Sequence, residues 1–252
     1  MQMVNLPQLK FYEEKLKLKW PVVYFTDLKR ENVAISSDPN LQTHMIFLPP
    51  KVLLNFDFYL CDILTELCRA KLGEEIDTIF CGPVFKKEYG KLEGKEREEF
   101  MEFAKMLFFA QSHVDIWAHD IRHSVFPYFT LIDFKTFLES ISKLIEKNDI
   151  KMLTSIVVKL SLAQEIAELK RYHFTELYPL LLSVIKKMPQ GTLNHIYRIS
   201  RFYQELPNIS FNKEKDIETL EKSVKEAARI LEFPVSFSLI KENDRYVWEI
   251  KH

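Results

Sequence analysis

The sequence predicts an α+β protein that is mainly helical, with a small N-terminal sheet packed on two long helices, a central helical bundle, and a C-terminal helix plus β-hairpin. Three features of the chain support this prediction. Short β-branched and aromatic runs come first, apolar residues at helical spacing dominate the middle, and period-two alternation appears in residues 235–250. Only 5 of the 252 residues are glycine, which disfavours glycine-rich phosphate loops and large all-β folds with many tight turns.

The N-terminal part predicts a short amphipathic helix, three strands and a long helix, in that order. The short helix covers 8–19, the strands cover 21–25, 32–36 and 44–48, and the long helix covers 56–72. Asn55 is the expected N-cap of the long helix, and Gly73 is its expected C-terminal stop.

The rest of the chain is predicted to form a series of helices followed by a final hairpin. Further helices are expected at 95–123, 131–148, 150–172, 174–188, 191–206 and 216–232. In the hairpin, Val235, Phe237 and Leu239 are expected on one face, opposite Tyr246, Trp248 and Ile250. The expected domains are an α+β domain at 1–130, a helical region at 131–207, and a helix plus hairpin at 208–252.

Composition narrows the classes of partner. Charged residues make up 28% of the chain and the net charge is −1, so no overall basic excess points to nucleic acid. The many Lys and Glu residues and the scarce Gly are similar to thermophile usage. Cys61, Cys68 and Cys81 have no paired pattern, which predicts reduced thiols and a cytoplasmic location. We expect no signal peptide and no membrane span, because the longest apolar run, 106–110, is too short.

Within residues 22–72, the extended segment VVYF is followed by ENVAIS and then by HMIFLPPKVL. A helix that contains TELCR comes next. This order resembles the core of zincin-type metallopeptidases of the gluzincin kind, in which a small sheet precedes a helix bearing H-E-x-x-H. In that motif two histidines one helical turn apart hold zinc, and the glutamate acts as general base on the metal-bound water. The resemblance therefore implies a zincin-like fold at 1–130.

The resemblance assigns Glu66 to the general-base position, and places Thr65 and Arg69 at the two histidine positions. Threonine is a poor zinc ligand and a guanidinium has no lone pair to offer, so the resemblance implies a degenerate site. The alternative is an ordinary structural helix, in which Glu66 and Arg69 form a surface pair. The buried stripe of that helix would consist of Leu60, Ile63, Leu64, Leu67 and Leu72, extended by Cys61 and Cys68.

A second candidate site lies in the segment HVDIWAHDIRH. Asp115, His119 and His123 follow one another at intervals of four residues and share a helix face, so two neighbouring members could bind zinc. Three cannot share one ion, because the first and last are about 12 Å apart along the helix. The resemblance implies a third metal ligand on this following helix, usually a glutamate, where this chain has Asp115 or His119. The alternative is a buried or surface polar network near the helix end.

Three functions follow from these features. The first is a metallopeptidase-related protein with a degenerate site, which binds a peptide or protein partner in a cleft between the TELCR helix and the strand at 44–48. The second is an active metal-dependent hydrolase that uses the metal candidates with Glu66 as base. The third is a helical interaction or nucleic-acid-binding protein, suggested by basic residues interleaved with aromatics around 170–173 and 197–203. The expected cofactor is accordingly either none or zinc.

Overall fold

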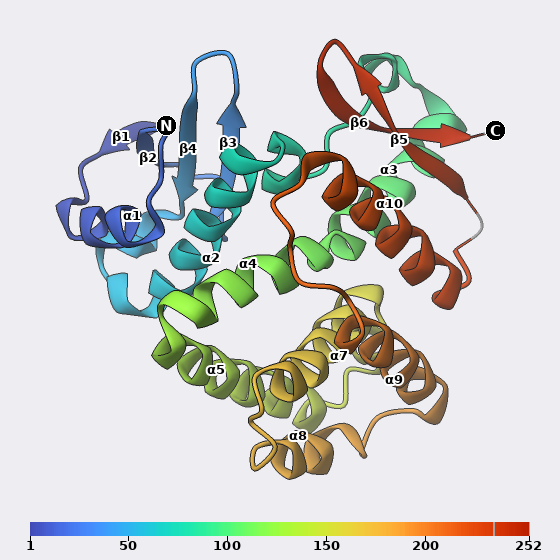
Figure 1. Cartoon of the computed structure of the whole chain (residues 1–252). Helices are drawn as coiled ribbons and strands as arrows, with labels where there is room; N and C mark the ends of the chain where they lie inside the picture. Colours follow the sequence, from blue (N-terminus) through green and yellow to red (C-terminus); the bar gives the residue numbers. More distant parts are fainter. Residues whose placement is uncertain (234, 252) are drawn as a thin grey trace.

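The computed structural model describes residues 1–233 and 235–251, without the side chains of 108–110 and 112–114. The strands are β1 (Gln2–Val4), β2 (Val22–Thr26), β3 (Ala34–Asp38), β4 (Thr43–Leu48), β5 (Ser236–Glu242) and β6 (Arg245–Lys251). The helices are α1 (Lys10–Leu16), α2 (Phe56–Glu75), α3 (Gly94–Ala110), α4 (Ser112–Val125), α5 (Pro127–Glu146), α6 (Ile150–Leu153), α7 (Ile156–Arg171), α8 (Tyr178–Ile185), α9 (Gln190–Gln204) and α10 (Lys213–Ile230). Helices make up 61% of the chain, which confirms the predicted fold class (Figure 1).

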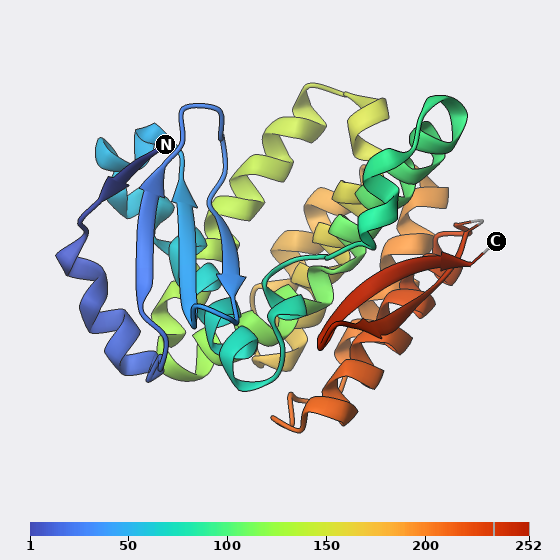
Figure 2. The same ribbon diagram turned by 90° about the horizontal axis from the view of Figure 1, so that it is seen from above.

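The N-terminal sheet has the strand order β1-β2-β4-β3. β2 and β4 are parallel and form the centre, while β1 and β3 pair antiparallel at the two edges. Alternate residues of β4, namely His44, Ile46 and Leu48, are fully buried, as expected for a strand with one face on the core. The sheet lies beside the helices, with β3 as the strand nearest to the rest of the molecule (Figure 2).

Two hydrophobic clusters form the core. One unites the N-terminal sheet and α2 with α10 and the C-terminal hairpin, and it includes Leu220, Phe237 and Trp248. The other is built from α5 to α9, with Ile166 and Ile196 among its fully buried residues. The chain therefore returns at its C-terminus to the core with which it began. The domain boundaries at 130 and 208 stay predictions.

Gly73 does not end the second helix, contrary to the sequence prediction. α2 continues to Glu75, and Gly73 lies inside it because another segment packs closely there. A Cβ on Gly73 would lie 2.5 Å from Cys81 Sγ, in the short 3-10 helix η3 (Thr78–Cys81). The glycine is thus required by close packing rather than by helix termination.

The helix predicted at 95–123 is two helices, α3 and α4, which meet at Gln111. Gln111 has φ −72° and ψ 4°, and its buried side chain donates to the carbonyl oxygen of Ile79 at 2.7 Å. That long-range bond fixes the residue at which the chain turns. The predicted hairpin is present, with Leu239 paired with Trp248 and Phe237 with Ile250, and β1 is an additional strand. Among the described residues, no helix is both long and apolar enough to cross a membrane.

Candidate functional site

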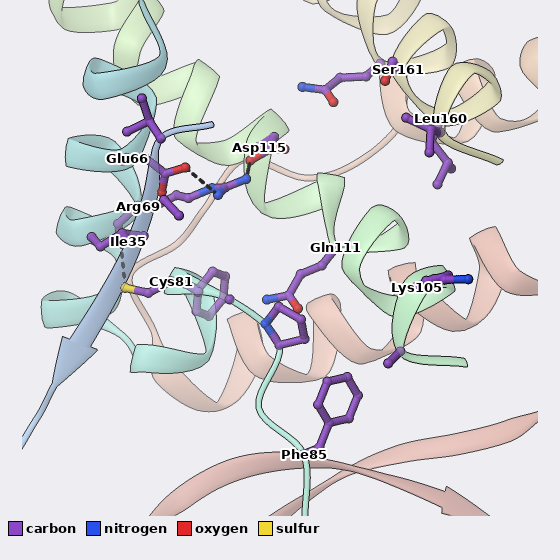
Figure 3. A pocket seen from close by; sticks show the side chains of 18 of the residues that line it. Ile35, Glu66, Arg69, Cys81, Phe85, Lys105, Gln111, Asp115, Leu160 and Ser161 are labelled. Carbon is purple, nitrogen blue, oxygen red and sulfur yellow. Dashed lines mark hydrogen bonds and ion pairs between the residues drawn. The ribbon is translucent and has the colours of Figure 1, made fainter. Parts of the chain in front are cut away.

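A cleft is bordered by β3, α2, α3, α4, α5 and α7, and Figure 3 shows part of it. It has two parts, which we call the apolar chamber, of about 680 Å³, and the acidic chamber, of about 380 Å³. Six residues line both chambers, so the two parts are continuous: Val33, Glu66, Arg69, Asp115, Ser161 and Gln164. The size of the cleft is suited to a ligand of several residues or a drug-sized molecule.

The apolar chamber is walled mainly by aliphatic and aromatic side chains. Phe80 and Phe85 come from η3 and the segment after it, Met101 comes from α3, and Val157 and Leu160 come from α7. Figure 3 shows Phe85 and Leu160 on opposite sides of the hollow. Such walls favour an apolar ligand group, because its transfer from water is favourable by about 25 cal/mol for each Å² buried.

The edge of the sheet forms another wall of the apolar chamber. Val33, Ala34 and Ile35, three consecutive residues, all line the chamber. Val33 directly precedes β3, and Ala34 and Ile35 are its first two residues. Because successive side chains of a strand point to opposite faces, Ala34 and Ile35 can both line one hollow where the hollow borders the strand's edge. β3 is an edge strand. Its outer backbone groups therefore lie beside the cleft, where an added strand could pair with them.

A row of charges separates the two chambers. Arg69 Nη1 donates to Glu66 Oε1 at 2.9 Å, and Arg69 Nη2 is paired with Asp115 Oδ1. Glu66 is 6% exposed, so the pair between Glu66 and Arg69 is not the surface pair of the structural alternative. Burial raises the pKa of Glu66, and the adjacent Arg69 opposes that rise. Figure 3 shows Arg69 reaching from α2 towards Asp115 on α4.

Thr65, at the other histidine position of the motif, is bonded to a second arginine. Its Oγ1 donates to the carbonyl oxygen of Cys61 at 3.1 Å and accepts from Arg122 Nη1 at 2.8 Å. Arg122 is only 1% exposed and is also paired with Asp133 on α5. Arg69 thus stands at one histidine position of the motif, and the guanidinium of Arg122 is bonded to the side chain at the other.

The residues present do not fit a zinc ion. Arg69 is a permanent cation and Thr65 is engaged by Arg122, so neither motif position offers a ligand. Among the residues whose positions are described, no group of three or more His, Cys, Asp or Glu side chains could hold a metal ion.

The structure separates the three metal candidates by their partners. Asp115 is paired with Arg69, while His119 Nδ1 lies 2.7 Å from Glu168 Oε1 and 3.2 Å from Gln164 Nε2. Asp115 and His119 line the acidic chamber, and His123 lines neither chamber.

His123 Nδ1 lies 3.1 Å from Thr130 Oγ1, and the imidazole stacks on Tyr172 at 4.2 Å between ring centroids. Burial lowers the pKa of His123. These contacts are those of a polar network between helices, the alternative that the sequence left open.

The acidic chamber holds carboxylates from four helices. They are Asp62 and Glu66 on α2, Asp115 on α4, Asp133 on α5 and Glu165 on α7. Burial raises the pKa of Glu165 well above its ordinary value, and the charges of Glu168 and Asp133 add to the rise. Desolvation by the walls of the chamber and the charge of the neighbouring Asp133 raise the pKa of Asp62 to about 6, although its side chain stays exposed to solvent at the surface.

Two buried acceptors along the cleft have no hydrogen-bond partner among the described residues. They are Glu66 Oε2 and Gln111 Oε1, on side chains that are 6% and 4% exposed. The Gln111 amide is fixed in orientation, because its nitrogen donates to Ile79. Arg69 Nε, a donor in the same wall, likewise has no acceptor in the part of the chain that the structure describes. Buried polar groups are nearly always hydrogen-bonded in proteins, so these three atoms are candidates for contacts with a ligand.

Sequence reasoning missed Asp62, Asp133, Glu165, Gln111 and Arg122. One signal was present: Asp62 and Glu66 are like charges one turn apart on a helix, which is unfavourable on an ordinary surface. The strand at the cleft was also misassigned. β4 lies inside the sheet between β2 and β3, so the strand that borders the cleft is β3 rather than the one at 44–48.

Comparisons with known proteins add no relative. No protein-family model, no curated protein and no solved structure matches this chain.

Proposed function

We propose that this protein is a non-catalytic peptide-binding protein, whose N-terminal part is a zincin-like scaffold with a degenerate active site. The observation that carries the proposal is the wall formed by Val33, Ala34 and Ile35, which brings the free edge of β3 to the apolar chamber. A peptide in extended conformation would add to this edge as a further strand and place side chains in the chamber.

The unpartnered polar atoms of the cleft support a peptide rather than a purely apolar ligand. A peptide backbone carries both N–H donors and carbonyl acceptors. Gln111 Oε1 and Glu66 Oε2 require donors, while Arg69 Nε requires an acceptor. An extended chain offers both kinds of group at short intervals, and its side chains supply the apolar contacts.

The charge row supports binding without hydrolysis. In the resemblance to zincins, catalysis depends on a metal ion that activates water. Arg69 takes the place of a ligand and is itself the cation between Glu66 and Asp115. A guanidinium stays protonated and carries no exchangeable water, so it cannot supply a nucleophile.

The two other functions have less support. The ligands expected for a metal-dependent hydrolase are each bonded to another group, as described above. In the basic segment suggested for nucleic acid, Arg171 and Tyr172 are both bonded to Asp120, which leaves them less available for phosphates.

The test is a selection of displayed random dodecapeptides on the wild-type protein, followed by calorimetry with the enriched peptides. Ala104 lines the apolar chamber from α3, so Ala104→Trp fills the chamber. Lys95 lies on the same helix and its side chain is 87% exposed, so Lys95→Trp is the matched control. We expect the enriched peptides to lose about tenfold or more in affinity for Ala104→Trp, since a lost apolar pocket costs about 1–3 kcal/mol, and to keep their affinity for Lys95→Trp.

Mass spectrometry of the same peptides after prolonged incubation gives the second readout, and we expect intact peptides. Peptides that bind Ala104→Trp as tightly as wild type would overturn the location of the site. Cleavage that disappears in Glu66→Gln would overturn the non-catalytic part and favour the hydrolase.

A further inference from the structure

The acidic chamber contains more negative charge than its own arginines neutralise. Arg69 is paired with both Glu66 and Asp115, and Arg122 is paired with Asp133. The remaining two carboxylates of the chamber have no such partner. No hydrogen bond or ion pair joins Asp62 or Glu165 to any residue that the structure describes.

These two carboxylates occupy different positions in the chamber. Asp62 is exposed and lies on α2, one turn before Glu66. Glu165 is half-buried and projects from α7. Placing unpaired negative charges in a walled hollow is unfavourable, because the half-buried Glu165 is partly desolvated and each carboxylate repels the next. A positively charged ligand would remove both penalties.

A second observation also indicates a missing donor. Glu66 lines the acidic chamber and is 6% exposed, and its Oε2 has no hydrogen-bond partner among the residues that the structure describes. Its other oxygen already accepts from Arg69. A buried carboxylate oxygen without a donor is costly, and an ammonium or guanidinium N–H would satisfy it.

The chamber is suited to an organic cation rather than a metal ion. Metal ions require several ligands at about 2.0–2.6 Å from one point, and the described residues contain no group of three or more metal-ligating side chains arranged in this way. An ammonium or guanidinium group instead donates to several oxygens about 2.7–3.0 Å away, which spaced carboxylates can provide.

We propose that the acidic chamber binds the ammonium or guanidinium group of a ligand whose apolar part lies in the adjoining apolar chamber. The shared wall of the two chambers, which includes Glu66 and Ser161, makes them parts of one cleft. The inference deepens the proposed function and rests on it in one respect: if the ligand is a peptide, the cation is a lysine or arginine side chain or the amino terminus.

Binding of such a cation should depend on pH through every group that faces the chamber. These groups are Asp62, Thr65, Glu66 and Arg69 on α2, Asp115, His119 and Arg122 on α4, Asp133 on α5, and Gln164, Glu165 and Glu168 on α7. Asp62 takes up a proton as the pH falls through about 6, and the raised pKa of Glu165 makes this carboxyl, too, take up a proton more readily than an ordinary glutamate. An alkylamine stays charged over this range, so its binding should weaken from pH 8 to pH 5.

The experiment uses 4-phenylbutylamine, which carries an apolar ring and a primary amine, and compares it by calorimetry with 4-phenylbutanol. We expect the alcohol to bind at least about tenfold more weakly, which corresponds to ~1.4 kcal/mol. The double variant Asp62→Asn/Glu165→Gln should lose the same factor for the amine and none for the alcohol. Glu98 is an exposed residue of α3, so Glu98→Gln is the matched control and should behave as wild type.

Three dipeptide amides distinguish the source of the cation. Leu-Phe-amide has a free amino terminus, acetyl-Leu-Lys-amide has a charged side chain, and acetyl-Leu-Phe-amide has neither. Preference for the first assigns the amino terminus, and preference for the second assigns the side chain.

Equal binding of amine and alcohol, or full amine binding by the double variant, would overturn the inference. Neutral peptides that bind the wild type and lose affinity for Ala104→Trp would then still support the proposed function. Amine binding without any peptide binding would instead leave the cation site standing and remove the peptide function.

Discussion

The guanidinium of Arg69 on α2 is paired with the carboxylate of Asp115 on α4, 46 residues further along the chain. The same guanidinium donates to the buried carboxylate of Glu66. One arginine thus connects two of the helices that wall the cleft and compensates the charges of two carboxylates. The cleft owes both its division into two chambers and its local charge balance to this residue.

Replacing Arg69 should destabilise the fold by more than the loss of a surface ion pair. In Arg69→Met the Glu66 carboxylate stays buried without its cation, so we expect the free energy of unfolding to fall by about 2 kcal/mol. This loss is smaller than that for a fully buried pair, because Arg69 is partly exposed. Urea denaturation at pH 7 measures the change. Arg229, whose pair with Glu226 is exposed, supplies the control, and Arg229→Met should cost no more than about 0.5 kcal/mol. Equal costs for the two variants would contradict the assigned role of Arg69.

Restoring the missing histidines should test the zincin-like scaffold directly. In Thr65→His/Arg69→His the helix carries H-E-x-x-H, with Asp115 on α4 as the third candidate ligand. If the scaffold is of the zincin kind, the purified double variant should retain one zinc per chain, and a further Asp115→Ala should weaken zinc binding by about tenfold or more. Elemental analysis measures the metal, and Thr65→His alone is the control. A folded double variant that binds no zinc would count against the scaffold.

Much of the fold could be predicted from local patterns. The strands β2, β3 and β4, the helix α2 and the C-terminal hairpin follow from periodicity and turn residues, which are properties of short segments. The errors have long-range causes. Gly73 suggested a helix end, but its reason is η3, which approaches from later in the chain. The break at Gln111 depends on a bond to Ile79, 32 residues away.

The candidate site was predictable only in part. The sequence indicated Glu66, Asp115 and His119, which do line the acidic chamber, because each lay in a recognisable motif. Asp133 and Glu165 come from helices that carry no motif, and only the packing of α5 against α2 and of α7 against α4 brings them to the same hollow. A single sequence contains no signal for such a meeting of four helices.

The charge of Asp62 should make the fold less stable at neutral pH than at acid pH. Its pKa is about 6 in the folded state, above the ordinary 3.8, so the folded state holds more protons between these values and stability falls as the pH rises through that window. We therefore expect Asp62→Asn to raise the free energy of unfolding at pH 7.5 by roughly 1 kcal/mol, discounted because the side chain is exposed.

Urea denaturation of the wild type and Asp62→Asn across pH 4 to 8 gives the profile. The two proteins should have nearly the same stability at pH 4, and the difference should develop by about pH 7. Asp57 is an exposed acid on the same helix, so Asp57→Asn is the control and should show no comparable pH-dependent gain. A variant less stable than wild type at pH 7.5 would mean that Asp62 has a stabilising partner.

The effect of Gly73→Ala should change sign with the residue at position 81. In a helix interior alanine is favoured over glycine by about 1 kcal/mol, but here the added Cβ would lie 2.5 Å from Cys81 Sγ. That sulfur is held by Ser37 Oγ at 3.0 Å and by the Arg69 carbonyl oxygen at 3.5 Å, so it cannot move freely. We expect Gly73→Ala to destabilise the wild type by about 1–2 kcal/mol through overpacking.

In Cys81→Ala the sulfur is absent, and Gly73→Ala should become stabilising. A double-mutant cycle by urea denaturation measures the coupling, and an identical effect of Gly73→Ala in both backgrounds would show that the contact does not explain the glycine.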